Sequence, residues 1–150
     1  MAGGAVLLVV VLASACRGWE GPLVADQRVN IVEPKPGSTV SEPVTLRWEW
    51  KDSRAPGIES GRWFAVYLDF PPPPPGQSAL TAAHTPCDSV AACLEAGELN
   101  GPNVYLTDAL QVHPTLRGGP GVEHRFTIVL VDEHGVRQGS VAWNAAFHIP

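Results

Sequence analysis

Residues 123–149 constrain the fold of this chain more than any other stretch. They contain two runs in which apolar and polar residues alternate, separated by a short turn at His134 and Gly135. A period of two is typical of half-buried β-strands, and two such runs around a short turn predict a β-hairpin. The chain therefore contains at least one antiparallel pair of strands with a buried face.

The register of this hairpin follows from its turn. If the loop holds only two residues, Phe126 faces Trp143. Two positions nearer the turn, Ile128 then faces Val141. The large apolar side chains gather on one face, whereas a slip by one residue would scatter them over both faces. We expect this face, continued by Phe147, to form part of the core.

The composition is that of a turn-rich β protein. A chain of 150 residues suits one domain with a single core. Gly and Pro each number 15, which favours many turns over a helical bundle. The net charge is -5 and the basic residues are scattered, so the chain has no basic stripe that would contact phosphates. DNA and RNA are therefore not expected as partners.

The N-terminus has the anatomy of a secretory signal. An apolar run within the first 13 residues is followed by small residues and then Cys16. A membrane span needs about 20 apolar residues, and charged residues directly after Cys16 end this run before that length. We therefore predict a signal peptide over 1–15, a tether over 16–27 and one domain over 28–150.

Residues 13–16, Ala-Ser-Ala-Cys, resemble the bacterial lipoprotein signal, in which the Cys receives a lipid and becomes the mature N-terminus. The same residues form an Ala-x-Ala site for ordinary signal peptidase, so secretion without a lipid is the alternative. Cysteine parity favours the lipid. If Cys87 pairs with Cys93 in an oxidising compartment, Cys16 is left over. We expect an extracytoplasmic chain attached to the cell membrane through Cys16.

Further strands are predicted from alternation and from the turns between them. They lie at 28–33, 44–50, 62–70, 103–107 and 109–113, and the hairpin brings the expected number to about seven. The strand at 62–70 has two apolar faces. One face carries Phe64, Val66, Leu68 and Phe70, and the other carries Trp63, Ala65, Tyr67 and Asp69.

Five consecutive prolines, Pro71 to Pro75, follow this third strand. None can donate a backbone hydrogen bond, so the run cannot join a sheet. It should be extended over roughly 15 Å, at about 3.1 Å per residue. We interpret it as a stiff connector at the rim of the domain, with a docking ligand for an aromatic groove as the alternative.

The stretch after the prolines is the least strand-like part of the domain. Residues 88–96 predict a short helix with Asp88 as its N-cap and Gly97 just past its end. Cys87 and Cys93 bracket part of this helix. A disulfide closing so small a ring would stabilise the fold by roughly 2 kcal/mol. We therefore expect a Pro-rich, disulfide-stapled excursion after the third strand.

The corner at 116–129 runs from Leu116 through Pro120 and Gly121 into the first hairpin strand, and it is similar to the corner of fibronectin type III domains. His124 stands where that family has a tyrosine. In that family the tyrosine hydroxyl hydrogen-bonds back to the backbone of the corner. A histidine can donate such a bond, so the resemblance implies this role for His124.

Residues 31–48 likewise resemble the first two strands of bacterial immunoglobulin-like modules. The whole pattern, with Pro74-Pro75-Gly76 and the Cys pair after it, resembles small bacterial lipoproteins that carry one immunoglobulin-like domain. This likeness implies an immunoglobulin or fibronectin III-like sandwich in the cell envelope and supplies no activity. The excess of Arg over Lys also favours a bacterial source.

The histidines and cysteines invite a metal-site interpretation that their spacing does not support. No HExxH, paired CxxC or His-x-His pattern occurs. The hairpin register places His124 opposite Ala145 on the core face and His148 on the other face, so the two cannot share a metal. No Gly-x-Ser-x-Gly motif occurs, and no nucleophile lies beside an evident base. We predict no metal, no cofactor and no catalytic residue.

A binding surface is the functional feature that remains. Trp63 and Tyr67 share one face of the third strand, and Trp50 lies at the rim near the prolines. If these rings are exposed, they form an aromatic platform for a sugar, a peptide or a partner domain. The alternative is that the excursion around Cys87 and Cys93 covers Trp63 and Tyr67, and their low exposure would exclude the platform.

Together these patterns predict an all-β sandwich that is exported, lipid-anchored and not an enzyme. It would act as a binding or structural module of the bacterial cell envelope, with an envelope protein or a glycan as its partner. Two alternatives remain open. One is an envelope protein that handles a metal or a small ligand, and the other is an accessory subunit of an envelope enzyme.

Overall fold

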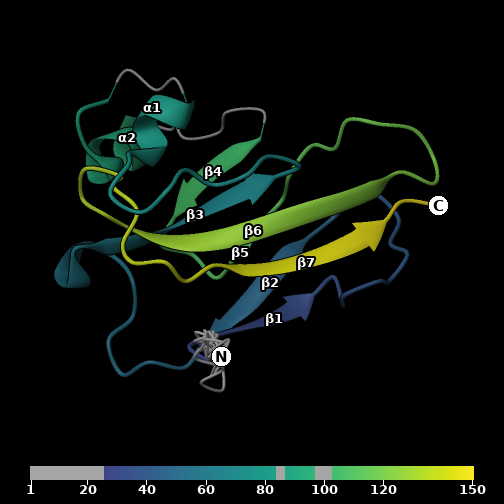
Figure 1. Cartoon of the computed structure of the whole chain (residues 1–150), viewed down its shortest axis with the longest axis horizontal. Helices are drawn as coiled ribbons and strands as arrows, with labels where there is room; N and C mark the ends of the chain where they lie inside the picture. The colour runs from purple at the N-terminus through teal and green to yellow at the C-terminus, as the bar shows by residue number, and fades with distance from the viewer. Residues whose placement is uncertain (1–25, 84–86, 97–102) are drawn as a thin grey trace, which may run out of the picture.

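The computed structural model describes residues 26–83, 87–96 and 103–150, and these form two antiparallel β-sheets that pack face to face (Figure 1). The three-stranded sheet has the order β1-β2-β5, and the four-stranded sheet has the order β4-β3-β6-β7. The predicted all-β sandwich is thus confirmed. The predicted signal peptide, Cys16 and most of the tether lie outside the described residues. Within the described residues, no helix is long and apolar enough to cross a membrane.

Each predicted strand contains an observed one, although several observed strands are shorter. The strands are β1 (Val29–Glu33), β2 (Leu46–Trp50), β3 (Arg62–Leu68), β4 (Val104–Thr107), β5 (Gln111–Val112), β6 (Glu123–Asp132) and β7 (Trp143–His148). The helical elements are the short 3-10 helix η1 (Ile58–Ser60), α1 (Ala79–Ala83) and α2 (Val90–Ala96).

The main core lies between the two sheets. Trp48 of β2 meets Phe64 of β3 edge to face, with ring centroids 5.3 Å apart. Phe126 of β6 and Phe147 of β7 are fully buried beside them. These side chains come from alternate positions of their strands, which is why one face of each strand is apolar. Trp48 and Phe126 thus pack the centre of the sandwich, and neither β2 nor β6 carries a cysteine that could cross-link the sheets.

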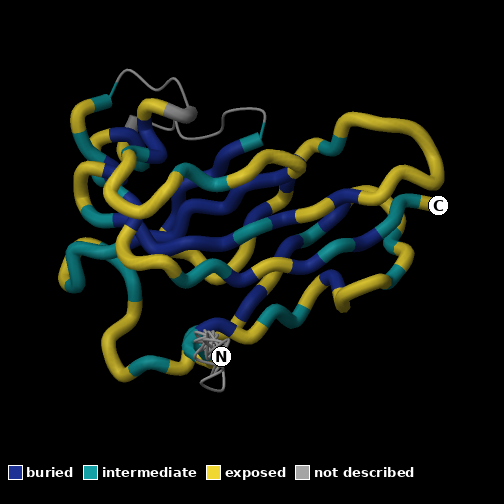
Figure 2. Tube along the Cα trace, in the orientation of Figure 1, coloured by how far each residue is buried: buried dark blue, intermediate teal, exposed yellow. Residues whose placement is uncertain are grey.

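A second apolar cluster covers the outer face of the four-stranded sheet, the face turned away from the other sheet. Trp63, Ala65 and Tyr67 of β3 pack there against residues of the excursion. Leu80 of α1 and Val90 of α2 belong to the same cluster. Burial therefore extends from the strands into the two short helices (Figure 2). Both faces of β3 are buried, so its near-continuous apolar sequence has a structural explanation.

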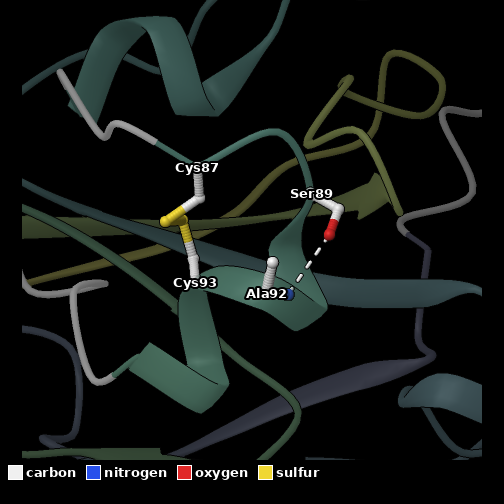
Figure 3. Close-up of a disulfide and its surroundings, with 4 residues drawn as sticks. All are labelled: Cys87, Ser89, Ala92 and Cys93. Carbon is white, nitrogen blue, oxygen red and sulfur yellow. Dashed lines mark hydrogen bonds between the residues drawn. A yellow bond between two sulfur atoms is a disulfide. The ribbon is translucent and has the colours of Figure 1, made fainter.

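The predicted disulfide is present within this cover. Cys87 and Cys93 are bonded, with their Cα atoms 5.4 Å apart (Figure 3). The predicted N-cap of the following helix is wrong by one residue. The Ser89 hydroxyl accepts a hydrogen bond of 3.2 Å from the backbone N–H of Ala92, so Ser89 rather than Asp88 is the cap. The predicted end of the helix at Gly97 lies outside the described residues.

The hairpin of β6 and β7 exists, but its predicted strand pairs are wrong. Phe126 faces Ala145, and Ile128 faces Trp143. The turn itself is where the sequence placed it, since Val131 bridges to Arg137 around His134.

The difference arises in the irregular segment 138–142. From the Val131–Arg137 bridge to the Ile128–Trp143 pair, β6 advances by three residues, whereas the opposite side of the hairpin advances by six. The ladder is thereby shifted by two residues from the predicted register. Because an even shift keeps every side chain on its face, Phe126, Ile128 and Trp143 are still buried in the main core.

The chain between β1 and β2 passes from one sheet to the other. Thr39 forms a parallel bridge with His148 of β7. The backbone N–H groups of Gly37 and Val40 donate to the carbonyl groups of Ala146 and His148, at 2.7 and 2.9 Å. This crossing covers part of the β7 edge, which would otherwise present free backbone groups.

Candidate functional site

The predicted aromatic platform is absent because its two central rings are buried. Trp63 is 2% exposed and Tyr67 is 0% exposed. The helices α1 and α2 cover them, which is the alternative that the sequence left open. Trp50 is not part of the same surface, because it lies on the other sheet and packs against Phe64 with ring centroids 5.6 Å apart.

Trp50 is also occupied by the chain itself. Its indole N–H donates to the carbonyl oxygen of Arg54 at 3.0 Å. The guanidinium carbon of Arg28 lies 5.7 Å from the ring centroids of both Trp50 and Trp143. Arg28 also forms an ion pair of 2.7 Å with Asp26, and this hydrogen-bonded contact holds the pKa of Asp26 below its ordinary value. These contacts therefore hold Asp26 and Arg28, at the start of the domain, against Trp50 and Trp143.

Two buried polar atoms of the outer cluster make no hydrogen bond within the described part of the chain. They are the indole N–H of Trp63 and the hydroxyl of Tyr67. Burial raises the pKa of Tyr67, and the positive charge of Arg137 offsets only part of that shift. An unpartnered buried polar group costs stability, so this cover is a less complete solution than the main core.

A groove lies at the C-terminal end of β3, where the chain leaves the sheet. Its volume is about 630 Å³, within the range of small ligand sites. One wall comes from the residues just after β3, and the other comes from the corner before β6 and from the first residues of β6. The lining residues are Asp69, Phe70, Pro71, Pro72, Arg117, Val122, Glu123, His124, Arg125 and Thr127. We call this the corner groove.

A short hydrogen-bond network fixes the floor of the corner groove. The Nδ1 of His124 lies 2.7 Å from one carboxylate oxygen of Asp69. The other oxygen accepts the backbone N–H of Arg125 at 2.8 Å, and the N–H of Asp69 donates to the carbonyl of Arg125 at 2.7 Å. The side chain of His124 is only 2% exposed. The hydrogen bonds of Asp69 thus connect the end of β3 to the start of β6.

This network corrects the role that the resemblance implied for His124. The ring hydrogen-bonds to a carboxylate at the end of the neighbouring strand and not to the backbone of its own corner. His124 also faces Phe147 rather than Ala145, with ring centroids 5.6 Å apart. The shifted register brings the larger ring over the imidazole.

The wall formed by Phe70 and the prolines corrects another expectation. Phe70 was predicted to continue the buried row of β3, but β3 ends at Leu68 and Phe70 is 49% exposed. Asp69 has a positive φ of 55°, which ends the alternation of the strand. The proline run then leads back toward the turn of the hairpin, where the guanidinium of Arg137 donates to the carbonyl of Pro73 at 2.7 Å and the N–H of Gly76 donates to the carbonyl of Arg137 at 3.1 Å.

The charges around the groove are unevenly paired. Glu123 lies 3.7 Å from Arg125 and 4.0 Å from His148 in exposed contacts. Asp69 is engaged by His124. Arg117, in contrast, makes no ion pair or hydrogen bond with any residue that the structure describes. The groove therefore offers a free guanidinium beside the apolar surface of Phe70 and Val122.

This arrangement is suited to recognition. An unpaired guanidinium presents donors that match a carboxylate, and the exposed apolar side chains beside it favour a ligand with an apolar group next to its negative charge.

No group of three His, Cys, Asp or Glu side chains in the described ranges is placed to hold a metal ion.

The contact between Asp69 and His124 was not predicted from the sequence. The signal was available in part, because antiparallel pairing of the third strand with the first hairpin strand brings 69 close to 125. It required knowing that β3 and β6 are neighbours, with Leu68 opposite Phe126. The exposure of Phe70 had no local signal, since it depends on the backbone conformation of Asp69.

Comparisons with protein-family models, with curated protein sequences and with solved structures found no match to this chain. A functional proposal for this chain must therefore be based on its fold and on the geometry of the corner groove.

Proposed function

We propose that this chain is an exported, lipid-anchored module of the bacterial cell envelope that binds a partner through the corner groove and does not catalyse a reaction. The observation that carries the proposal is the unpaired Arg117 beside the exposed side chains of Phe70 and Val122. These two side chains are 49% and 41% exposed and line the same groove, although large apolar residues are usually buried. Clustered exposed apolar side chains mark binding surfaces.

The sandwich is proposed to be of the immunoglobulin or fibronectin III-like kind. Its strands divide three and four between antiparallel sheets, and the chain crosses between the sheets after β2, after β4 and after β5. The stretch after β1 also passes from one sheet to the edge of the other. These Greek-key features support the assignment, because they are typical of such sandwiches.

The disulfide supports the extracytoplasmic location. Cys87–Cys93 closes a small ring in the covering excursion, and disulfides persist mainly in oxidising compartments. With these two cysteines paired, Cys16 is the remaining thiol, and lipidation at the Ala-Ser-Ala-Cys sequence gives it a role. The membrane is then reached through the lipid and not through a spanning helix.

The anchoring half of the proposal is tested with the full chain in a bacterial host that processes lipoproteins. We expect the mass of the mature protein to include a diacylglyceryl group on Cys16, and we expect the protein to sediment with membranes. The variant Cys16→Ser should lose the lipid and leave the membrane fraction. A native mature chain without the added mass of a diacylglyceryl group, or equal fractionation of the two proteins, would contradict the anchor.

The binding half is tested by capture from detergent-solubilised membranes. Phe70→Ser removes an apolar side chain from the groove, whereas Leu110→Ser removes one that is comparably exposed, at 42%, and lies outside it. Proteins that the native chain retains should be lost with Phe70→Ser and kept with Leu110→Ser. Equal retention by both variants would exclude the groove as the contact surface.

A further inference from the structure

The end of the molecule opposite the corner groove carries a turn with complementary chemistry. Ile58 of η1 is 76% exposed, more than any other large apolar side chain in the described ranges. Glu59 follows it and makes no ion pair with any described residue. The turn thus presents an apolar tip with a free carboxylate beside it, the two groups that the groove is suited to hold.

This turn is held by its own backbone, so little conformational entropy is lost when it binds. The N–H of Gly57 donates to the carbonyl of Arg62 at 2.6 Å. The N–H of Gly61 and the hydroxyl of Ser60 donate to the carbonyl of Gly57 at 3.1 and 3.0 Å. A ligand that is already rigid in its bound shape binds more tightly than a flexible one.

We propose that the corner groove binds the Ile58–Glu59 turn of a second copy of this chain. The carboxylate of Glu59 would pair with Arg117, and Ile58 would lie against Phe70 and Val122. This proposal rests on the groove being the contact surface of the proposed function, and it names the occupant. Three of the four exposed large apolar side chains in the described ranges, Ile58, Phe70 and Val122, would then be covered by one contact.

The position of the two surfaces sets the kind of assembly. The turn directly precedes β3 and the groove begins directly after it, so they lie at opposite ends of one strand (Figure 1). A surface at one end that binds a different surface at the other end makes a head-to-tail contact. Such contacts add further copies and do not stop at a symmetric dimer.

The two carboxylates that line the groove are engaged by other residues, so they do not compete for Arg117. Asp69 is bound by His124 and by the backbone of Arg125, and Glu123 lies near Arg125 and His148. A single turn in a single groove is a small interface, below the roughly 1,600 Å² of stable complexes. The association should therefore be weak and concentration-dependent.

The test is sedimentation velocity of the full chain in a mild detergent over a hundred-fold range of concentration. The native chain should sediment faster as its concentration rises. Glu59→Arg and Arg117→Glu each place like charges in the contact, and each should need at least a tenfold higher concentration for the same shift, since charge pairing at interfaces changes affinity on this order. Glu95→Arg is the matched control, because this exposed residue of α2 lies outside both surfaces.

An equimolar mixture of Glu59→Arg and Arg117→Glu distinguishes this contact from a general charge effect. The arginine at position 59 of one variant meets the glutamate at position 117 of the other, so association should return in the mixture. Association of the single variants at the native concentration, no recovery in the mixture, or a native chain that stays monomeric throughout would overturn the proposal. If the chain is monomeric but Phe70→Ser still loses captured proteins, the groove is confirmed as a contact surface and only the second copy is excluded.

Discussion

The two faces of β3 are both buried, but by different kinds of structure. The inner face, with Phe64 and Val66, meets another sheet whose side chains alternate in the same way. The outer face, with Trp63 and Tyr67, meets two short helices that are stapled by a disulfide. Among the described residues, the inner cluster leaves one buried polar atom without a partner, the indole N–H of Trp48, whereas the smaller outer cluster leaves two, on Trp63 and Tyr67. Strand alternation in two sheets therefore forms the main core, whereas the two short helices only cover the outer face of one sheet.

The inner face should be the more costly to disturb. Phe126 is fully buried between the sheets, and Phe126→Ala is expected to lower the free energy of unfolding by about 3–5 kcal/mol through lost burial and a residual cavity. Denaturant unfolding measures this loss. Val122→Ala removes methyl groups from an exposed position and should change stability by less than about 0.5 kcal/mol. Equal effects of the two substitutions would contradict the assigned core.

The fit of the outer cover is tested at Gly135. A Cβ at this position would lie 2.7 Å from Leu80 Cγ and 3.3 Å from the backbone nitrogen of Leu80, and φ is +70°. Gly135→Ala should therefore destabilise by about 2–4 kcal/mol, combining a left-handed backbone with overpacking. Gly139 has nearly the same φ, +69°, with open space around it, so Gly139→Ala should cost only about 1–2 kcal/mol. No difference between the two would mean that α1 is not packed as described.

The staple of the outer cover should contribute less than either. Replacing Cys87 and Cys93 by alanine is expected to cost roughly 2 kcal/mol, because the disulfide closes only a small ring. Reduction of the native chain should lower its unfolding free energy by a similar amount. The double variant should not respond to reductant, and a response would point to a different cause.

The smallest effect is expected for an unpartnered hydroxyl beneath the cover. Tyr67→Phe removes a buried hydroxyl that has no hydrogen-bond partner among the described residues, so stability at pH 7 should change by no more than about 1 kcal/mol and in the stabilising direction. A large loss of stability at pH 7 would show that the Tyr67 hydroxyl makes a hydrogen bond in solution.

The same residue predicts a pH dependence. Burial raises the pKa of Tyr67 above the value of about 10 that it has when unfolded, so the folded state keeps the proton while the unfolded state loses it. Stability should therefore fall as the pH rises above about 10, by up to about 1.4 kcal/mol per pH unit for this residue. Tyr67→Phe should remove this part of the pH dependence of stability. The part that is due to Tyr105, whose pKa burial also raises, should remain. An unchanged alkaline slope would contradict the burial of Tyr67.

Much of the inner face was predictable from the sequence because it follows from local alternation. The positions of the strands, the faces of β3 and the turn at His134 are all set by neighbouring residues. The exact register of β6 and β7 was not, because the irregular segment 138–142 changes the pairing without changing the period. The two-residue shift left Phe126 and Trp143 on their predicted face but gave each a different partner.

The corner groove was less predictable because it depends on long-range pairing and on one backbone angle. The Asp69–His124 contact joins residues 55 positions apart, and it forms only because β3 and β6 are neighbours. The exposure of Phe70 follows from the positive φ of Asp69, for which the sequence carries no strong signal. The aromatic platform failed for a related reason, since alternation shows which face a ring occupies but not whether something covers it.

The corner groove, and not the covered outer face of the sheet, is where we propose that this domain makes its contacts. The most direct measurement places a photoreactive side chain at Val122, in the groove, or at Glu95, exposed on α2, and irradiates living cells that make the full chain. We expect a cross-linked product from position 122, with the mass of two copies of this chain, and none from position 95. Cross-links from position 95 with none from position 122 would exclude the groove as the contact surface.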